Sequence, residues 1–322
     1  MKWNQHPGGI LAALLSAAAL GMTCNAFAQP AQEGLTVQEE GDSVWIRHDG
    51  RTLLRYRFGE VPFKPYVQEW FSPKGVNILR DAPADHKHHH ALMFAISVDG
   101  VNFWEEKDAP GTQAHRGLSA VHTGRTGDVA YASLTEQLDW IAPPTGAVLL
   151  HETRTIRVYD TPPPEAALLT WESRFEVPAG KEKAVLGGSH YFGLGMRFVE
   201  SMDTVGEFAV PQGALGEIVR GDEHLTAAPW CAYTAPAGGH SVTVALFGDP
   251  GNVRHPPLWF TMKEHFAYIA ATLNLWREPL EVASGTPLVL RYGAALWDGT
   301  TDAQRIESTY RRWLELSAPP KQ

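Results

Sequence analysis

Short apolar segments separated by turn-forming residues recur along the chain from about residue 35 onward. Polar and apolar side chains alternate within several of them, most clearly over 148–159, and a period of two is typical of strands with one buried face. Asp49-Gly50 and Asp99-Gly100 each lie between two apolar segments, where this dipeptide favours a tight hairpin turn. The pattern predicts strands at 44–47, 52–58, 91–98, 117–122, 129–140, 148–159, 167–177, 208–211, 230–233, 241–247, 266–275 and 288–296.

The number and spacing of these segments predict the fold class. The 30 glycines and 23 prolines supply turns between many short strands, and no internal repeat or linker is visible. We therefore expect an all-β fold, a large antiparallel β-sandwich, rather than an alternating α/β fold. Helical spacing is convincing only near the end, where Ile306, Tyr310 and Trp313 follow the capping pair Thr301-Asp302. One C-terminal helix that ends before Pro319 is predicted.

The first 28 residues have the parts of a secretory signal peptide. Lys2 supplies a positive start, residues 10–22 are apolar and rich in small side chains, and Ala26-Phe27-Ala28 forms a cleavage site. The sequence predicts a signal peptide at 1–28, a single β-sandwich domain at 29–322 and a periplasmic or secreted location.

Charge and cysteine content narrow the class of protein. The formal net charge is −9 at pH 7 and no basic run is present, which argues against nucleic acid and anionic membrane surfaces as partners. No later segment approaches the roughly twenty apolar residues of a membrane span, so none is predicted. After cleavage Cys231 is the only thiol, so no intrachain disulfide is expected.

Ionisable and metal-binding side chains are densest in one segment directly before an apolar segment. It has the sequence Asp85-His86-Lys87-His88-His89-His90. On an extended backbone, His86, His88 and His90 would share one face and His89 would point to the other. Imidazoles beside a carboxylate can bind a transition metal or transfer protons, and His86 and His88 are the candidate ligands of one divalent metal ion. The alternative is a solvated, polar entry to a strand.

A second candidate stretch is the loop 249–259, which carries Arg254, His255 and Trp259 among prolines. A rigid loop holds side chains in fixed positions, as a binding site requires. The alternative is a turn with a satisfied surface pair of arginine and histidine.

Four further stretches are weaker candidates. Glu105, next to Trp104, is either a general acid or base or a solvated strand end, and His115 lies in a loop that can approach the first histidines. Glu152 and Arg154 share one strand face, which indicates either a site or a cross-strand ion pair, and the ion pair is the preferred interpretation. The glycine-rich run 187–195 lacks the lysine and the following helix of a phosphate loop, so its glycines favour close sheet packing or an open cleft floor.

The segments 85–92, 101–104 and 252–256, together with His115, resemble the motifs of a bacterial family catalogued as methane oxygenase PmoA-like proteins. The resemblance implies a large β-sandwich similar to the galactose mutarotase-like supersandwich, in exported proteins of organisms that degrade polysaccharides. Such folds carry mutarotases, lyases and hydrolases that act on sugars. The chain departs from the family pattern in having His90 where arginine is usual, Ala91 where glycine is usual and Val253 where proline is usual.

We therefore expect an exported carbohydrate-active enzyme, an epimerase, lyase or hydrolase, that acts on a sugar or oligosaccharide by histidine and carboxylate acid-base chemistry. A non-catalytic carbohydrate-binding protein and a metal-dependent oxygenase-type oxidoreductase are the alternatives. The candidate residues are His88, His89 and His255 as catalytic groups, and Arg254, Trp104, Trp259 and His115 as substrate-binding groups.

Overall fold

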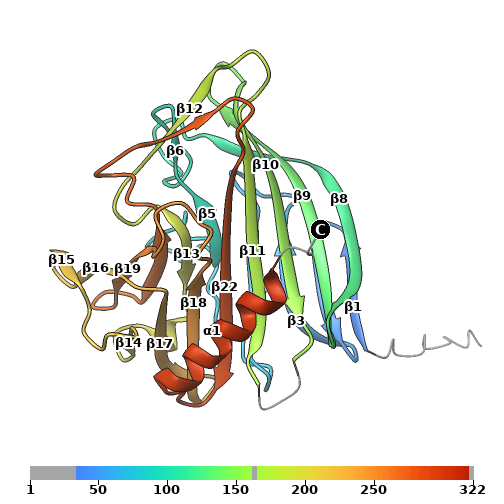
Figure 1. The fold of residues 1–322 in the computed structure, drawn as a ribbon, viewed down its shortest axis with the longest axis vertical. Helices are drawn as coiled ribbons and strands as arrows, with labels where there is room; N and C mark the ends of the chain where they lie inside the picture. Colours follow the sequence, from blue (N-terminus) through green and yellow to red (C-terminus); the bar gives the residue numbers. More distant parts are fainter. Residues whose placement is uncertain (1–33, 162–164, 319–322) are drawn as a thin grey trace, which may run out of the picture. The chain divides into compact units, whose positions relative to one another are not determined.

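Three antiparallel sheets contain most of the regular structure in the computed structural model, which describes residues 34–161 and 165–318 (Figure 1). The first sheet has ten strands in the order β1-β2-β3-β4-β5-β13-β20-β19-β16-β15. The second has eight, in the order β14-β17-β18-β22-β11-β10-β9-β8, and the third has four, in the order β21-β12-β6-β7. The all-β prediction is confirmed. The predicted signal peptide at 1–28 lies outside the described residues.

The strands and helices have the following bounds: β1 Leu35–Glu40, β2 Ser43–His48, β3 Arg51–Arg57, β4 Tyr66–Trp70, β5 Leu92–Ala95, β6 Ser97–Val98, β7 Val101–Asn102, β8 Thr112–Thr126, β9 Val129–Ala142, β10 Ala147–Tyr159, β11 Ala167–Glu176, β12 Lys183–Gly187, β13 Gly193–Arg197, the 3-10 helix Glu200–Met202, β14 Glu207–Ala209, β15 Glu217–Arg220, β16 Glu223–Ala227, β17 Trp230–Ala237, β18 His240–Gly248, β19 Leu258–Met262, β20 Tyr268–Thr272, β21 Leu280–Ala283, β22 Leu288–Asp298 and α1 Ala303–Ser317.

The two predicted Asp-Gly hairpins are present. Asp49 and Gly50 have φ angles of 48° and 76° between β2 and β3, and Asp99 and Gly100 have 50° and 81° between β6 and β7. Each predicted strand is represented, with longer bounds for β8 and shorter bounds for β20. The predicted strand 91–98 is divided into β5 and β6, which belong to different sheets. The pattern did not predict β13, because its sequence GLGMR offers little alternation and both of its faces are buried.

The two large sheets pack face to face around an aromatic core. Phe94 of β5 lies 6.2 Å from Trp140 of β9 and 5.5 Å from Phe175 of β11, measured between ring centroids. These side chains are fully buried or nearly so, and the first belongs to the ten-stranded sheet while the others belong to the eight-stranded sheet. In the sequence of β10, every second side chain is buried, and these side chains point into the space between the two sheets.

A buried ion pair on β10 faces this core. The guanidinium of Arg154 donates to both carboxylate oxygens of Glu152, at 2.8 and 2.9 Å, and both side chains are fully buried. Arg154 Nη1 also donates to the carbonyl of Pro65 at 2.9 Å, and Nη2 donates to Gln113 Oε1 at 2.8 Å. The preferred ion pair is present, but it forms between two residues on one face of β10 rather than across two strands, and Arg154 ties β10 to the segments facing it.

Helix α1 covers the outer face of the eight-stranded sheet (Figure 1). Asp302 accepts a hydrogen bond from the backbone nitrogen of Arg305 at 2.8 Å, which caps the helix as the sequence predicted. Ile306, Tyr310 and Trp313 are buried in a second apolar cluster with residues of β18 and β22. The helix therefore has a packing role.

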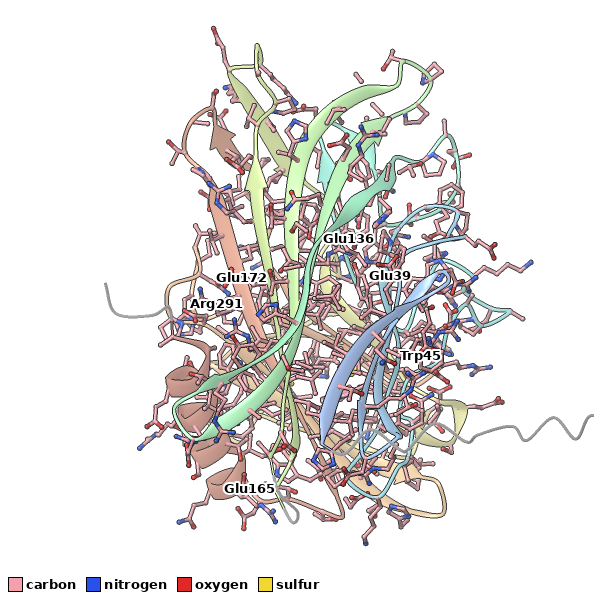
Figure 2. The ribbon with its side chains drawn as sticks, turned by 90° about the vertical axis from the view of Figure 1, so that its right-hand side faces the viewer. Glu39, Trp45, Glu136, Glu165, Glu172 and Arg291 are labelled. Atoms are coloured by element: carbon pink, nitrogen blue, oxygen red, sulfur yellow. The ribbon has the colours of Figure 1, made fainter. Side chains whose placement is uncertain are left out.

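Polar pairs occupy other parts of the outer surface. Figure 2 shows Glu172 of β11 beside Arg291 of β22, and Arg291 Nε donates to Glu172 Oε2 at 2.7 Å. No helix in residues 34–161 and 165–318 has the length and apolar character of a membrane span.

Candidate functional site

A pocket of about 740 Å³ opens beside the histidine-rich segment, and we call it the His–Trp pocket. Its residues come from the histidine turn, the segment after β7, and the ends of β15, β16, β19 and β20. Its lining residues are Asp85, His86, His88, His89, Trp104, Glu105, Lys107, Tyr191, Arg220, Gly221, Asp222, Glu223, Phe260, Met262, Glu264, His265, Phe266 and Tyr268.

The histidine segment is a turn, and the prediction of an extended backbone is wrong. The backbone nitrogen of His86 donates to the carbonyl of Pro83 at 3.0 Å, and that of His89 donates to the carbonyl of His86 at 2.9 Å. This curvature places His86, His88 and His89 in the pocket and directs His90 elsewhere. The alternation argument failed because the periodicity of two holds only on a strand.

His89 lies deepest among these histidines. Its side chain is 3% exposed, its ring stacks 5.1 Å from Tyr268 and 4.7 Å from His86, and Trp104 contacts it edge-on at 5.1 Å. Neither ring nitrogen has a hydrogen-bond partner in the described part of the chain. A buried imidazole without partners costs free energy, so these two nitrogens are available to a ligand.

Two neighbours of His89 also have a buried polar atom without a hydrogen-bond partner. Trp104 Nε1 and the hydroxyl of Tyr268 are buried and lack partners among the residues that the structure describes. A Cβ atom on Gly195 of β13 would lie 1.7 Å from that hydroxyl, so only glycine leaves room for it. The interpretation that glycines of the run 187–195 permit close packing is confirmed. A polar floor beneath aromatic walls suits a ligand with several hydroxyl groups.

Two histidines of the pocket, His88 and His89, have lowered pKa values. Burial lowers the pKa of His88 to about 4, and the neighbouring His86 and Lys64 add to the shift. Burial, followed by the effects of His88, His86 and Arg197, lowers the pKa of His89 well below its ordinary value. A neutral imidazole donates from one nitrogen and accepts at the other, so His89 can bind a hydroxyl group but is a weak base near pH 7.

Two carboxylates are better placed for proton transfer. Glu105 accepts hydrogen bonds from Tyr191 at 3.2 Å and from Asn102 at 3.0 Å. Glu223 lies 2.9 Å from His190 Nε2, and its side chain is 8% exposed. Both line the pocket, and their partners Tyr191 and His190 are adjacent in the chain.

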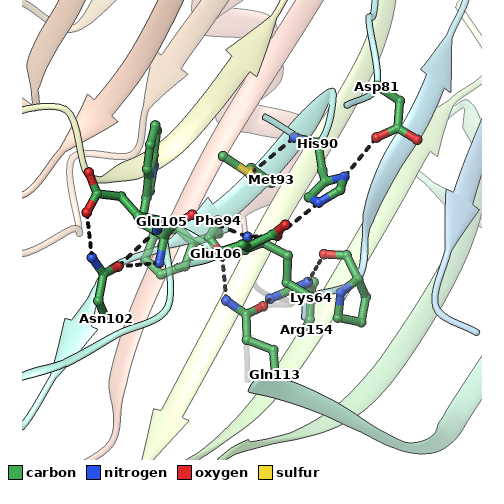
Figure 3. Close-up of polar contacts among 12 residues, drawn as sticks. Lys64, Asp81, His90, Met93, Phe94, Asn102, Glu105, Glu106, Gln113 and Arg154 are labelled. Carbon is green, nitrogen blue, oxygen red and sulfur yellow. Dashed lines mark hydrogen bonds and ion pairs between the residues drawn. The ribbon is translucent and has the colours of Figure 1, made fainter. Parts of the chain in front are cut away.

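His90 anchors the pocket wall from behind (Figure 3). Its Nδ1 lies 2.8 Å from Asp81 Oδ1 and its Nε2 lies 2.9 Å from Glu106 Oε1. The buried ammonium of Lys64 forms an ion pair with the same Glu106 carboxylate and donates to the carbonyl of Trp104 at 3.4 Å. These contacts fix the segment that carries Trp104 and Glu105.

The second predicted stretch does not join the first. Arg254 donates to the carbonyls of Leu273 and Glu278 at 2.7 and 2.6 Å, and His255 does not line the pocket. Trp259 is fully buried and donates from Nε1 to the carbonyl of Ala228 at 2.7 Å, so no face of its ring is open to a sugar. The alternation along β19 explains the difference, since its neighbour Phe260 lines the pocket.

The remaining predicted residues have separate positions. His115 lies on β8 rather than in a loop, 2.6 Å from the buried carboxylate of Glu136, and stacks on Phe58 at 4.6 Å between centroids. The rings of His86 and His88 are 5.6 Å apart between centroids. No group of three or more histidine, cysteine, aspartate or glutamate side chains suited to a metal ion occurs among the described residues, and the metal assignment remains a prediction.

The sequence model of a family described as "Family of unknown function (DUF6807)" matches residues 43–311. The chain belongs to this family. The match covers the His–Trp pocket and both predicted motif stretches. The description of DUF6807 assigns no activity and carries no methane oxygenase label, so that part of the resemblance remains a prediction. No curated protein matches the sequence.

Solved structures with a related arrangement are distant from this DUF6807 chain. An alpha-galactosidase from Lactobacillus brevis is 9% identical with a TM-score of 0.39, over 84% of this chain and 40% of its own length. A protein from Klebsiella pneumoniae described as a putative aldose 1-epimerase is 10% identical with a TM-score of 0.44, over 89% of this chain and 88% of its own. The chain thus spans less than half of the first structure, and similarity at this level carries no argument about activity.

Sequence reasoning missed part of the DUF6807 pocket. Glu223, Tyr191 and Tyr268 were not candidates, because each lies far along the chain from the histidine turn. A signal was present only for Tyr191, which lies in the glycine-rich run with His190. The predicted residues that the structure brings together are His86, His88, His89, Trp104 and Glu105.

Proposed function

We propose that the His–Trp pocket binds a sugar or oligosaccharide and that the chain is a carbohydrate-active enzyme, exported as its first 28 residues predict. The observation that carries this proposal is the pocket floor, where both nitrogens of the buried His89 lack partners beside two further unpartnered polar atoms. Sugars present many hydroxyl groups and apolar ring faces, and this combination of polar floor and aromatic wall complements both.

Glu105 and Glu223 are the proposed acid-base groups. Each lines the pocket and has a tyrosine or histidine hydrogen-bond partner that can hold its orientation. His88 and His89 take binding roles instead, because their lowered pKa values make them poor proton acceptors near pH 7. Epimerisation, elimination and hydrolysis all use such carboxylates, and analysis of the products separates them.

The same lowered pKa values favour a second candidate, a carbohydrate-binding protein without catalysis. Such a protein needs the polar floor and the aromatic walls but no proton-transfer group.

Turnover and binding on a panel of mono- and oligosaccharides distinguish the two functions. For an enzyme, Glu105→Gln or Glu223→Gln should lower kcat by at least about 100-fold while the Kd for the same sugar changes little. Glu281→Gln is the matched control, since Glu281 is exposed on β21 and pairs with Lys183. Saturable binding without product in the wild type would select the binding protein, and neither binding nor product would refute the proposal.

A further inference from the structure

A second, shallow depression of about 560 Å³ lies next to the His–Trp pocket, and we call it the Trp276 depression. It is formed by backbone and small side chains of the four-stranded sheet and by the loop between β20 and β21. Its lining residues are Ser97, Gly100, Asn102, Val185, Gly187, Gly188, Ser189, Phe192, Trp276 and Pro279.

Trp276 is the only exposed tryptophan in the part of the chain that the structure describes, with 40% of its surface accessible. Its ring contacts His190 at 5.7 Å between centroids, and His190 in turn hydrogen-bonds Glu223 of the pocket. The exposed ring is therefore linked to the wall of the proposed sugar site.

The loop that presents Trp276 is held in place at several points. Arg254 donates to the carbonyls of Leu273, Glu278 and Pro279, which flank the tryptophan on both sides. Arg277 lies 4.8 Å from the Trp276 ring centroid, and its Nη2 atom donates to both carboxylate oxygens of Glu217 at 2.7 and 2.8 Å. Arg254 thus acts as a positioning residue for this loop, although it does not line the pocket. A ring fixed in this way loses little freedom when a ligand stacks on it.

The depression and the His–Trp pocket share one wall. Phe192 lines the depression and stacks at 5.3 Å and 10° on Trp104, which lines the pocket. Asn102 lines the depression and donates to Glu105 of the pocket at 3.0 Å (Figure 3). A ligand that extends out of the pocket over this wall reaches the depression directly.

The charges around the two hollows indicate a neutral ligand. The described residues that line the depression include no acidic, basic or histidine side chain. In the pocket, acidic side chains outnumber lysine and arginine, so an anionic saccharide would be repelled. The acidic residues are Asp85, Glu105, Asp222, Glu223 and Glu264, against Lys107 and Arg220.

From these observations we infer that the Trp276 depression is a second subsite of the proposed sugar site, and that the ligand is a neutral oligosaccharide whose chain stacks on Trp276. This inference rests on the proposed function. The inference requires that sugar affinity increase with the length of the oligosaccharide, because only an oligosaccharide can occupy both hollows. It also requires that this increase depend on Trp276.

Isothermal titration with neutral gluco-, galacto-, manno- and xylo-oligosaccharides of increasing length, starting from each monosaccharide, tests this inference. In the wild type, chains long enough to cross the shared wall should bind about tenfold more tightly than the monosaccharide. Trp276→Ala should remove this increase and leave monosaccharide affinity unchanged, whereas Trp276→Phe should restore part of it. Arg254→Ala should act like Trp276→Ala, because the loop loses its carbonyl contacts.

Trp45→Ala is the matched control. Trp45 is a half-buried tryptophan on β2, stacked with Arg47 and Arg55, and it lines neither hollow (Figure 2). Its replacement should leave the length dependence intact. An unchanged increase in Trp276→Ala, or monosaccharide binding with no length dependence in the wild type, would overturn the subsite while leaving the proposed function standing. Absence of binding to every sugar would overturn both.

Discussion

The Nε2 atom of His90 lies 2.9 Å from Oε1 of Glu106, the residue after the pocket carboxylate Glu105. The other ring nitrogen faces Asp81, so a protonated His90 donates to two carboxylates at once. Arginine, usual at this position in the motif that the chain resembles, also offers several donors to carboxylates. The histidine therefore supplies a comparable bridge, with the difference that its charge depends on pH.

The free energy of unfolding should depend on pH because the charge of His90 does. Burial lowers the pKa of His90, but the hydrogen bonds to Asp81 and Glu106 outweigh it and raise the pKa above the ordinary 6.5. A raised pKa in the folded state adds stability that is complete below 6.5 and is lost as pH rises through the folded value. Urea unfolding from pH 5 to 9 should show this loss in the wild type and not in His90→Gln. Parallel pH profiles for the two proteins would contradict the assignment.

Two of the pocket histidines, His88 and His89, should titrate abnormally. Imidazole nitrogen chemical shifts, assigned with His88→Asn and His89→Asn, should show His88 titrating near pH 4 and His89 remaining neutral above that pH. Because the folded pKa of His88 is lowered, its contribution to stability is present above 6.5 and is lost as pH falls towards 4. A titration of His89 near 6.5 would restore it as a candidate general base.

The buried ion pair should be costly to break. Arg154→Met leaves the buried carboxylate of Glu152 without its cation and should lower the free energy of unfolding by about 3–5 kcal/mol in urea denaturation. Arg174→Met is the matched control, because Arg174 pairs with Glu176 at the same spacing on the neighbouring strand, with both side chains more than 40% exposed. It should cost less than about 1 kcal/mol. Equal losses would show that burial does not set the strength of these pairs.

The close approach of β13 to Tyr268 should tolerate no side chain. Gly195→Ala places a Cβ atom 1.7 Å from the tyrosine hydroxyl and should lower the free energy of unfolding by about 1–3 kcal/mol, with a loss of sugar affinity as the ring moves. At Gly187 no atom lies within 4 Å of an added Cβ, so Gly187→Ala should stay within about 0.5 kcal/mol of the wild type. If Gly195→Ala is as stable and binds as well, the floor is not packed as described.

Local patterns in the sequence predicted local features well. The period of two located β10, the Asp-Gly dipeptides located two turns, and Asp302 located the helix start, since each signal depends on neighbours in the chain. The pocket depends on neighbours in space. The sequence around the histidines does not predict that Glu223 lies in the pocket. Glu223 reaches the pocket because β16 pairs with β19 at the far end of the ten-stranded sheet.

The difference between neighbours in the chain and neighbours in space also explains the outcome for the loop 249–259. A single site that uses Arg254 and His255 together with the histidine turn requires the two stretches to meet in space, which the sequence left open. The structure instead gives Arg254 carbonyl partners in the loop of Trp276, a contact that depends on how that loop turns back after β20. The spacing of residues in the sequence does not predict the path of this loop. The role of Arg254 as a positioning residue is therefore visible only in the three-dimensional structure.

The most direct test of the proposed sugar site replaces His89 by phenylalanine, which keeps an aromatic ring and removes both nitrogens. If those nitrogens serve only a ligand, His89→Phe should unfold at the same or a higher urea concentration than the wild type, yet bind the preferred sugar at least about tenfold more weakly in isothermal titration. A variant that binds the sugar as tightly as the wild type would contradict the account, and so would one that is destabilised with its sugar affinity unchanged.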